Sequence, residues 1–319
     1  MNPKKFSKRH HYLPVFYLKG FSDTNQNIFV YDKIRDEIIG KQDPKSQFYK
    51  NHLNNFRING EIVFSFEESI FTPKDTSIAP LFSRFRSTLN YQFTAYEKFE
   101  LLHFLSQLYW RSPDTNEKFV ELIKKEGFNN SSFGLRSKDG NKLTDEDIPE
   151  FLKKLLSDSE LQKMFKHLIP VSNASLDELE KLVRKWKVFD LSTTDATFIT
   201  GDRPFVINNT DVRLNNVFDE MIFPLSRNKV LILSEKSPDF FDSIALMNIN
   251  LTIVTQSQRF IASHNLDYLQ YVIDEFKRFQ SLNLLDDLLK GTFGIMYHQS
   301  KFNDYEEYLK YYNELKSNH

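Results

Sequence analysis

The chain has 319 residues, of which 40% are hydrophobic and 27% charged, and it contains no cysteine. This length and composition predict a globular protein that can bury a large core. The missing cysteine excludes disulfides, a thiolate nucleophile and cysteine-ligated zinc. The 42 basic and 43 acidic side chains leave a net charge of −1, so no overall positive field attracts nucleic acid or an anionic membrane.

Aromatic residues are frequent, with 31 Phe and 14 Tyr. We expect most of them to pack in the core, the alternative being a surface on which bases stack. The N-terminal segment is basic, but no apolar run follows it, so it lacks the pattern of a secretory signal. No stretch approaches the roughly 18 apolar residues that cross a bilayer. The sequence therefore predicts a cytoplasmic protein without a membrane partner.

The first part of the chain predicts short elements. Strands are expected at residues 27–31, 37–39 and 62–66. Pro14 suits the first turn of a short helix over residues 15–18, and Gly20 is expected to stop that turn. Asn59 and Gly60 form a strong turn signal before the third strand.

Apolar residues at helical spacing dominate the middle of the chain. They predict helices at residues 80–91, 96–110, 116–125, 145–156, 161–167 and 176–187. Pro80 suits the first position of the first of these helices, and Pro113 ends the second. Ser175 and Glu178 form a capping-box pattern at the start of the last.

After Trp186 the pattern changes to short strands and then returns to helices. Strands are predicted at residues 188–191, 196–200, 220–224, 229–233 and 259–262, and helices at 239–255, 266–279, 282–289 and 306–315. This order indicates a helix-rich α+β fold with a small, mostly antiparallel sheet and a central helical cluster. Because no linker divides the chain, we expect a single domain over residues 1–319, or two closely packed lobes, 1–187 and 188–319.

Several well-known catalytic motifs are absent. The chain has no Walker phosphate loop, no G-x-G-x-x-G dinucleotide fingerprint and no G-x-S-x-G, H-E-x-x-H or EF-hand pattern. Candidate site residues therefore come from local clusters of polar side chains.

The first cluster contains His10 and His11, between a basic arm and an apolar turn. Adjacent side chains diverge, so the two histidines are not expected to ligate one metal as a simple pair. We expect His11 to face inward because the segment Tyr12–Pro14 follows it directly. There it can act as a general acid or base, with His10 beside it as a substrate-binding candidate. The alternative is a hydrogen-bonded histidine that packs the arm onto the body.

The second cluster is a Gly-Asp-Arg-Pro turn after the predicted strand at residues 196–200. Catalytic carboxylates often lie on loops at strand ends, where a rigid scaffold aims them. Asp202 is a candidate general base or ligand for Mg²⁺ or Mn²⁺, and Arg203 a candidate phosphate contact. The alternative is ordinary turn chemistry, which favours Asp and Pro for backbone reasons.

Three further residues are candidates. Arg111 ends a helix, where it can bind substrate or simply answer the helix dipole. Asn250 lies within an apolar helix and requires partners if buried, so it either binds ligand or ties two elements together. His264 is a possible second imidazole, with a structural role as the alternative.

Several short motifs occur, each once, along the chain. They are His11, Tyr12, Pro14, Tyr17 and Leu18; Arg111 and Pro113; Thr200, Asp202 and Pro204; Phe223 to Ser226; and Asn250, Arg259 and Phe260. Together they resemble a bacterial family catalogued as domain of unknown function 4238. The chain departs from the family pattern at Val15 for Gln, Gly20 for Asn, Gly201 for Ser and Arg203 for Asn. The resemblance implies no activity.

The residues favour a nuclease-like hydrolase that acts on phosphodiester bonds, as a toxin or anti-phage effector, with RNA as the favoured nucleic acid. His11 and Asp202 would be catalytic, with Mg²⁺ or Mn²⁺ as a candidate cofactor, and Arg111 and Arg203 would stabilise phosphate charge. A small-molecule hydrolase or nucleotide-processing enzyme would use the same residues. The other alternative is a non-enzymatic module that binds a partner protein or nucleic acid, in which His11 and Asp202 are structural.

Overall fold

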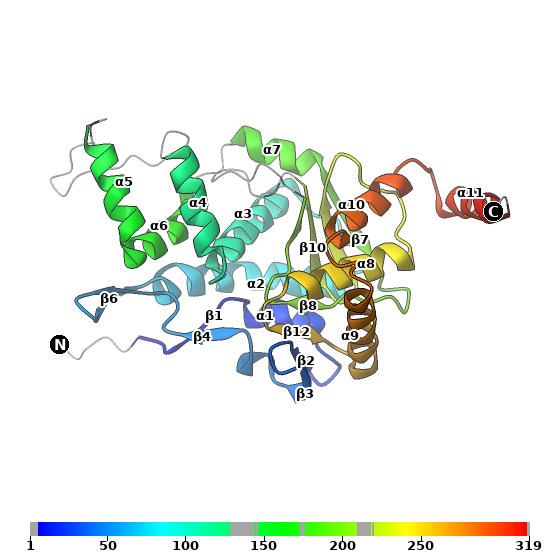
Figure 1. Ribbon diagram of the computed structural model, residues 1–319, viewed down its shortest axis with the longest axis horizontal. Coiled ribbons are helices and arrows are strands. Elements are labelled where there is room, and N and C mark those ends of the chain that lie inside the picture. The colour runs from blue at the N-terminus through cyan, green and yellow to red at the C-terminus, as the bar shows by residue number, and fades with distance from the viewer. Residues whose placement is uncertain are drawn as a thin grey trace.

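The computed structural model describes residues 6–127, 144, 146–172, 176–208, 218 and 220–317. It is a mixed α+β fold rich in helix, and its strands pair antiparallel, as the sequence predicts. Helices from the middle of the chain lie to the left of the central sheets in Figure 1, and helices from the C-terminal part lie to the right. In the described part of the chain, no helix is long and apolar enough to cross a membrane.

The N-terminal segment forms β1 (Arg9–His11), which pairs antiparallel with β4 (Tyr49–Asn51). The short helix α1 (Val15–Leu18) follows Pro14, as predicted. Gly20 does not stop that turn, because the chain continues into a 3-10 turn, η1 (Lys19–Phe21). Its role is close packing: a Cβ at Gly20 would lie 3.3 Å from the Cα of Ser226.

Two hairpins follow. The first joins β2 (Ile28–Asp32) and β3 (Glu37–Gln42), and after the turn η2 (Pro44–Ser46) and β4 the second joins β5 (Asn55–Ile58) and β6 (Glu61–Ser65). Asn59 and Gly60 have φ values of 51° and 84°, so the predicted tight turn is confirmed.

Two four-stranded sheets lie at the centre. The order of the first is β3-β2-β12-β8 and that of the second β7-β11-β10-β9. Their remaining strands are β7 (Trp186–Asp190), β8 (Thr200–Gly201), β9 (Val206–Ile207), β10 (Met221–Ser226), β11 (Lys229–Leu233) and β12 (Phe260–Ser263). The strand predicted at residues 196–200 is wrong in extent, because only Thr200 pairs with β12.

The helices of the middle region pack beside the sheets. They are α2 (Thr72–Ser87), α3 (Ala95–Arg111), α4 (Thr115–Glu126), α5 (Asp147–Ser157), α6 (Ser159–Ser172) and α7 (Leu176–Arg184). The predicted start at Pro80 is wrong: a π-helical turn, η3 (Glu67–Phe71), leads into α2 with Pro73 in its first turn. Ser175, the predicted cap of α7, lies outside the described residues.

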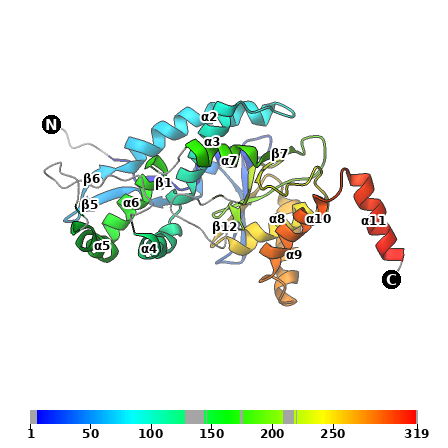
Figure 2. The same cartoon turned by 90° about the horizontal axis from the view of Figure 1, so that it is seen from above.

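Four more helices complete the chain: α8 (Ser243–Gln256), α9 (Leu266–Ser281), α10 (Leu288–Gln299) and α11 (Tyr305–Ser317). The helix predicted at residues 282–289 is wrong, because Asn283 adopts a positive φ and breaks the chain direction between α9 and α10. Helix α8 packs on α9, α10 and β8, and α11 projects from the body (Figures 1 and 2).

The core is aromatic and continuous. Buried side chains from α1, α2, α3, both four-stranded sheets and α8 to α10 belong to one hydrophobic cluster. Tyr17 stacks on Phe223 at 5.3 Å, and Phe82 contacts Phe104 at 5.5 Å. The core therefore crosses the boundary at residue 187 that the two-lobe alternative places between its parts.

Candidate functional site

Asp202 follows β8 and is almost buried, with 8% of its surface exposed. Its carboxylate accepts backbone N–H groups from Gln258 at 2.8 Å, Arg259 at 2.7 Å and Phe260 at 3.2 Å. Burial raises the pKa of Asp202, while these three donors oppose the rise. The carboxylate thus holds the chain as it leaves α8 and enters β12.

Gly201 leaves room for this turn. The hydroxyl of Ser257 lies where a Cβ at position 201 would be, so any larger residue requires that hydroxyl to rotate away. Ser257, at the C-terminal end of α8, therefore occupies the space that a serine side chain at position 201 would need.

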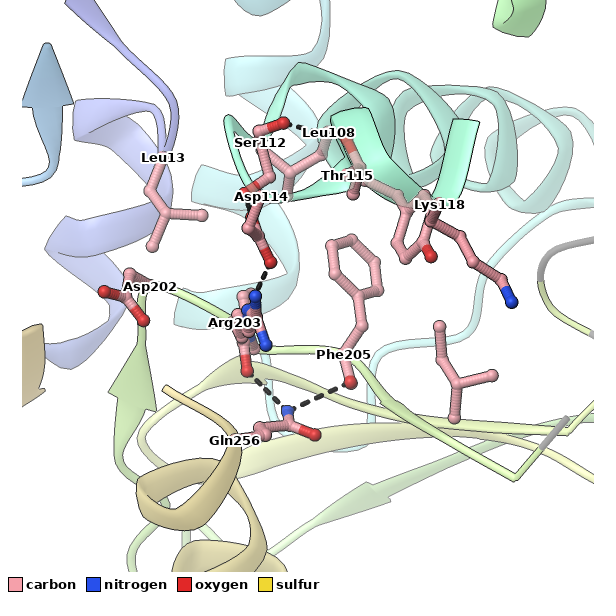
Figure 3. A pocket seen from close by; sticks show the side chains of 13 residues that line it. Leu13, Leu108, Ser112, Asp114, Thr115, Lys118, Asp202, Arg203, Phe205 and Gln256 are labelled. Carbon is pink, nitrogen blue, oxygen red and sulfur yellow. Dashed lines mark hydrogen bonds and ion pairs between the residues drawn. The ribbon is translucent and has the colours of Figure 1, made fainter. Parts of the chain in front are cut away.

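Arg203 points across the cleft to Asp114, on the loop between α3 and α4, and the two form an ion pair (Figure 3). Gln256, at the end of α8, donates its amide to the carbonyls of Arg203 at 2.5 Å and Phe205 at 3.0 Å. The backbone of the segment 203–205 is thereby fixed, whereas the Arg203 side chain remains about one-third exposed, at 36%.

A pocket of about 280 Å³ lies on one side of this ion pair. We call it the Phe205 pocket, because the Phe205 ring points into it below Thr115 and Lys118 of α4 (Figure 3). Tyr109 packs edge-on against Phe205 at 5.7 Å. The pocket is thus mainly apolar and aromatic, with a few polar groups from Asp114, Arg203 and Lys118 at its wall, a composition typical of small-molecule sites.

A second pocket, of about 250 Å³, contains Tyr49, Lys50 and Arg259, and we call it the Tyr49 pocket. Both pockets share the residues Ser112, Asp114, Asp202 and Arg203. The Asp114–Arg203 pair therefore separates the two, and we refer to them together as the divided cleft.

Lys166 of α6 lies behind the Asp114 loop. It is buried, and its ammonium donates to the carbonyl of Ser112 at 2.8 Å. Burial lowers the pKa of Lys166 to about 7, although the nearby Asp114 opposes the shift. The proton occupancy of Lys166 therefore changes near neutral pH, next to the loop that carries Asp114.

The expected orientation of the two histidines is wrong. His10 is fully buried: the N–H of Asn54 donates to its Nδ1 at 2.9 Å, and its Nε2 donates to the carbonyl of Ser7 at 2.8 Å. His11 is half-buried and bonds the carbonyl of Lys45 at 3.1 Å. The reason is the β1 strand, which turns neighbouring side chains to opposite faces. Burial lowers the pKa of His11, and His11 lines neither pocket of the divided cleft.

Arg111 is also buried, with 2% of its side chain exposed. Its guanidinium contacts Asp75 at 2.8 Å and Glu67 at 3.4 Å, and it lies 4.7 Å from the centre of the Phe71 ring. Two carboxylates thus compensate its charge. The dipole explanation was incomplete because these partners come from η3 and α2, distant in sequence.

Asn250 is fully buried and bonded on every side. Its carbonyl accepts the N–H of Ile199 at 3.1 Å, and its amide donates to the carbonyl of Thr197 at 3.0 Å and the hydroxyl of Tyr268 at 2.8 Å. No amide hydrogen remains for a ligand, so Asn250 ties α8 to α9 and to the segment before β8.

His264 contacts Thr197 at 3.4 Å, and burial with the nearby Arg227 lowers its pKa to about 4.

The predicted site residues therefore separate. Asp202 and Arg203 lie together in the divided cleft, whereas His10, His11, Arg111 and Asn250 do not line it. Among the described residues, no three His, Asp or Glu side chains gather as a metal site. Sequence reasoning missed Asp114 and Phe205. Each directly follows a proline, Pro113 or Pro204, but only the fold brings Asp114 to Arg203.

A family model described as "Protein of unknown function (DUF4238)" matches residues 9–267. The chain belongs to this family. The DUF4238 match includes every residue of the divided cleft and ends within α9, so α10 and α11 lie beyond it. In this DUF4238 member, Arg203 is a charged partner for Asp114. No curated protein and no solved structure matches the chain significantly.

Proposed function

We propose that this protein binds a nucleotide-like phosphate ester in the divided cleft and hydrolyses its phosphoester bond. One observation carries the proposal: Arg203, about one-third exposed and paired with Asp114, lies between the aromatic Phe205 pocket and the Tyr49 pocket. A flat ring can pack against Phe205 and Tyr109, while Arg203 and Lys118 supply the donors that phosphate oxygens prefer.

The Asp114–Arg203 pair suggests how charge is exchanged. An incoming phosphate competes with Asp114 for the Arg203 guanidinium, because a bidentate arginine contact suits either anion. The released Asp114 carboxylate then lies beside the phosphate, where it can accept a proton from an attacking water. Asp202 keeps the floor of the cleft in place through its three backbone contacts.

This proposal changes the predicted assignment of roles. His11, half-buried and away from the lining residues, supports the N-terminal arm, and Asp114 takes the part of the general base. Phosphodiester substrates, RNA included, would enter with one terminal nucleotide, because the Phe205 pocket of about 280 Å³ holds a single small ligand. Mg²⁺ or Mn²⁺ would arrive with the phosphate rather than on a preformed set of three protein ligands.

Isothermal titration with AMP, GMP, CMP and UMP, and with ribose 5-phosphate, tests the binding step. We expect at least one mononucleotide to bind more tightly than ribose 5-phosphate, and Phe205→Leu to remove that advantage. Hydrolysis of bis(p-nitrophenyl) phosphate and of a short RNA, with and without Mg²⁺, tests the reaction. The proposal fails if no mononucleotide binds. The hydrolytic part alone fails if mononucleotides bind but Asp114→Asn cleaves both substrates as fast as the wild type does.

A further inference from the structure

Another pocket, lined mainly by polar residues, lies away from the divided cleft and shares no lining residue with it. Its volume is about 500 Å³, and it forms where η1, the C-terminal end of α2 and the turn between β10 and β11 meet. We call it the Arg227 pocket. Its wall includes Ser226 and Gly20, whose close packing joins the first and last of these elements.

Three cations line the Arg227 pocket: Lys19, Arg86 and Arg227. Arg86 donates to the carbonyl of Phe16 at 2.6 Å, and Arg227 donates to the carbonyl of Ser22 at 3.2 Å. Within the residues that the structure describes, neither guanidinium has a carboxylate partner. Arginines that line a pocket elsewhere in this protein, such as Arg203, are paired with an acid.

Both unpaired arginines are half-buried, so each positive charge is partly removed from water without a carboxylate to balance it. Burial lowers the pKa of Arg86, so the fold stabilises its charged form poorly without an anion. Each guanidinium has five N–H donors, of which only one is used in the contacts above. Several donors with fixed directions therefore remain for a ligand.

The remaining polar groups of the pocket fit an anion with several oxygens. Ser83 and Thr24 are exposed at the wall, and their hydroxyls have no hydrogen bond to the described residues. The one acid, Asp23, accepts the N–H groups of Asn25 at 2.9 Å and Asn27 at 2.8 Å and pairs with Lys41 at 3.3 Å. Its charge is therefore engaged within its own loop.

We propose that the Arg227 pocket binds the phosphate group of a phosphomonoester or inorganic phosphate. Arg86 and Arg227 hold the phosphate oxygens from two sides, because planar guanidinium groups match phosphate geometry. Lys19 adds a third positive charge, and the hydroxyls of Ser83 and Thr24 donate to the remaining oxygens. The site is separate from the proposed catalytic cleft, and Arg227 follows directly after the segment Phe223–Ser226.

The test uses the full chain carrying Arg203→Gln, so that phosphate binding in the divided cleft is already weakened. Inorganic phosphate, glycerol 3-phosphate and sulfate are titrated by calorimetry at constant ionic strength, with chloride as the reference. We expect saturable binding of phosphate that falls about tenfold or more on Arg227→Gln, as expected for a charge-assisted hydrogen bond. Tighter binding of glycerol 3-phosphate than of inorganic phosphate would identify an ester as the preferred form.

Two further variants keep the result interpretable. Arg86→Lys retains the charge and is expected to weaken phosphate binding less than Arg227→Gln. Arg35→Gln removes an exposed arginine that lines neither the Arg227 pocket nor the divided cleft, and it should leave binding unchanged. The proposal is overturned if phosphate binds no better than chloride at the same ionic strength. It is also overturned if Arg227→Gln, folded by circular dichroism, binds phosphate as tightly as its parent.

Discussion

Tyr17 shows how one side chain connects the two central sheets. Its hydroxyl donates to the carbonyl of Pro224 in β10 at 3.0 Å and lies 3.0 Å from the hydroxyl of Thr200 in β8. All three positions lie within the residues that the family model matches. A buried polar group must be bonded to be tolerated, so this tyrosine is needed for its oxygen as well as for its ring.

We therefore expect Tyr17→Phe to lower the free energy of unfolding by about 1–3 kcal/mol, because Thr200 and Pro224 lose their partner in the interior. Urea denaturation measures the change. Tyr96→Phe is the matched control, since Tyr96 is 72% exposed, and it should have no measurable effect. Equal stability of the wild type and Tyr17→Phe would show that the hydroxyl does not join the sheets.

His167 is a second informative residue. Its ring packs against Phe66 at 5.0 Å and Phe71 at 5.1 Å, is 2% exposed and has no hydrogen bond on either nitrogen among the described residues. Burial, followed by the charges of Lys166 and Arg111, lowers its pKa well below the usual 6.5. The unfolded chain therefore binds a proton at this residue below pH 6.5 that the folded protein does not bind.

From this sign, the stability that depends on neutral His167 is present above pH 6.5 and is lost as the pH falls. His167→Phe should raise the free energy of unfolding at pH 7 by about 1–2 kcal/mol, since it removes unpaired polar atoms from an aromatic site. It should also flatten the loss of stability between pH 6.5 and pH 5. Urea titrations at several pH values measure both effects, and an unchanged pH slope would contradict the expected neutral histidine.

Sequence reasoning at this scale identified positions better than roles. Asp202 and Asn250 were recognised as special polar residues, and both are buried with several hydrogen bonds. Apart from Tyr268, which is 18 residues from Asn250, their partners lie 51 to 58 residues away in sequence, so no local pattern could assign those bonds. The predicted orientation of His10 and His11 was wrong for another reason: strand geometry alone cannot tell which of two neighbouring side chains faces inward.

At the scale of elements, the β5–β6 hairpin depends on one glycine. Gly60 has a φ of 84°, a conformation that residues with a Cβ rarely adopt. Gly60→Ala should therefore cost about 1 kcal/mol or more of unfolding free energy. Gly291, inside α10 with no atom within 4 Å of a new Cβ, is the opposite case.

Because alanine favours helix, Gly291→Ala should stabilise the protein by about 0.5–1 kcal/mol. Thermal unfolding of both variants by circular dichroism provides the comparison. A shift of the same sign for both would contradict the assignment of the turn or of the helix.

Element prediction succeeded where apolar periodicity was strong. The bounds of β11 were predicted correctly at residues 229–233, and α3 differs from its predicted range by one residue at each end. Helix α2 was misplaced because Pro80 was taken as a start signal, although the helix tolerates it internally. The segment before β8 was taken as strand, but its residues bond Asn250 and Arg227 instead of a neighbouring strand.

At the scale of the whole molecule, the continuous core predicts one cooperative unfolding transition. Trp110 lies in α3 of the helical cluster and Trp186 in β7 of the second sheet. Single-tryptophan variants, Trp110→Phe and Trp186→Phe, let fluorescence follow each region separately in urea. We expect both to agree with far-UV circular dichroism. Distinct midpoints in the two variants would indicate two lobes that unfold independently.

The fold class followed from the order of patterns along the chain, whereas the divided cleft did not. The cleft joins Asp114, between two helices, to Arg203, after a short strand, and to aromatic residues of both regions. Such a site requires the tertiary arrangement, which periodicity and motifs do not specify.

The central claim is that Arg203 exchanges Asp114 for a ligand phosphate, and the affinity of Asp114→Asn for mononucleotides tests it most directly. The account predicts that this variant binds the best mononucleotide several-fold more tightly than the wild type, because Arg203 no longer has to leave a carboxylate. Arg203→Gln, measured beside it by calorimetry, should bind about tenfold more weakly. Unchanged or weaker binding by a correctly folded Asp114→Asn would contradict the exchange.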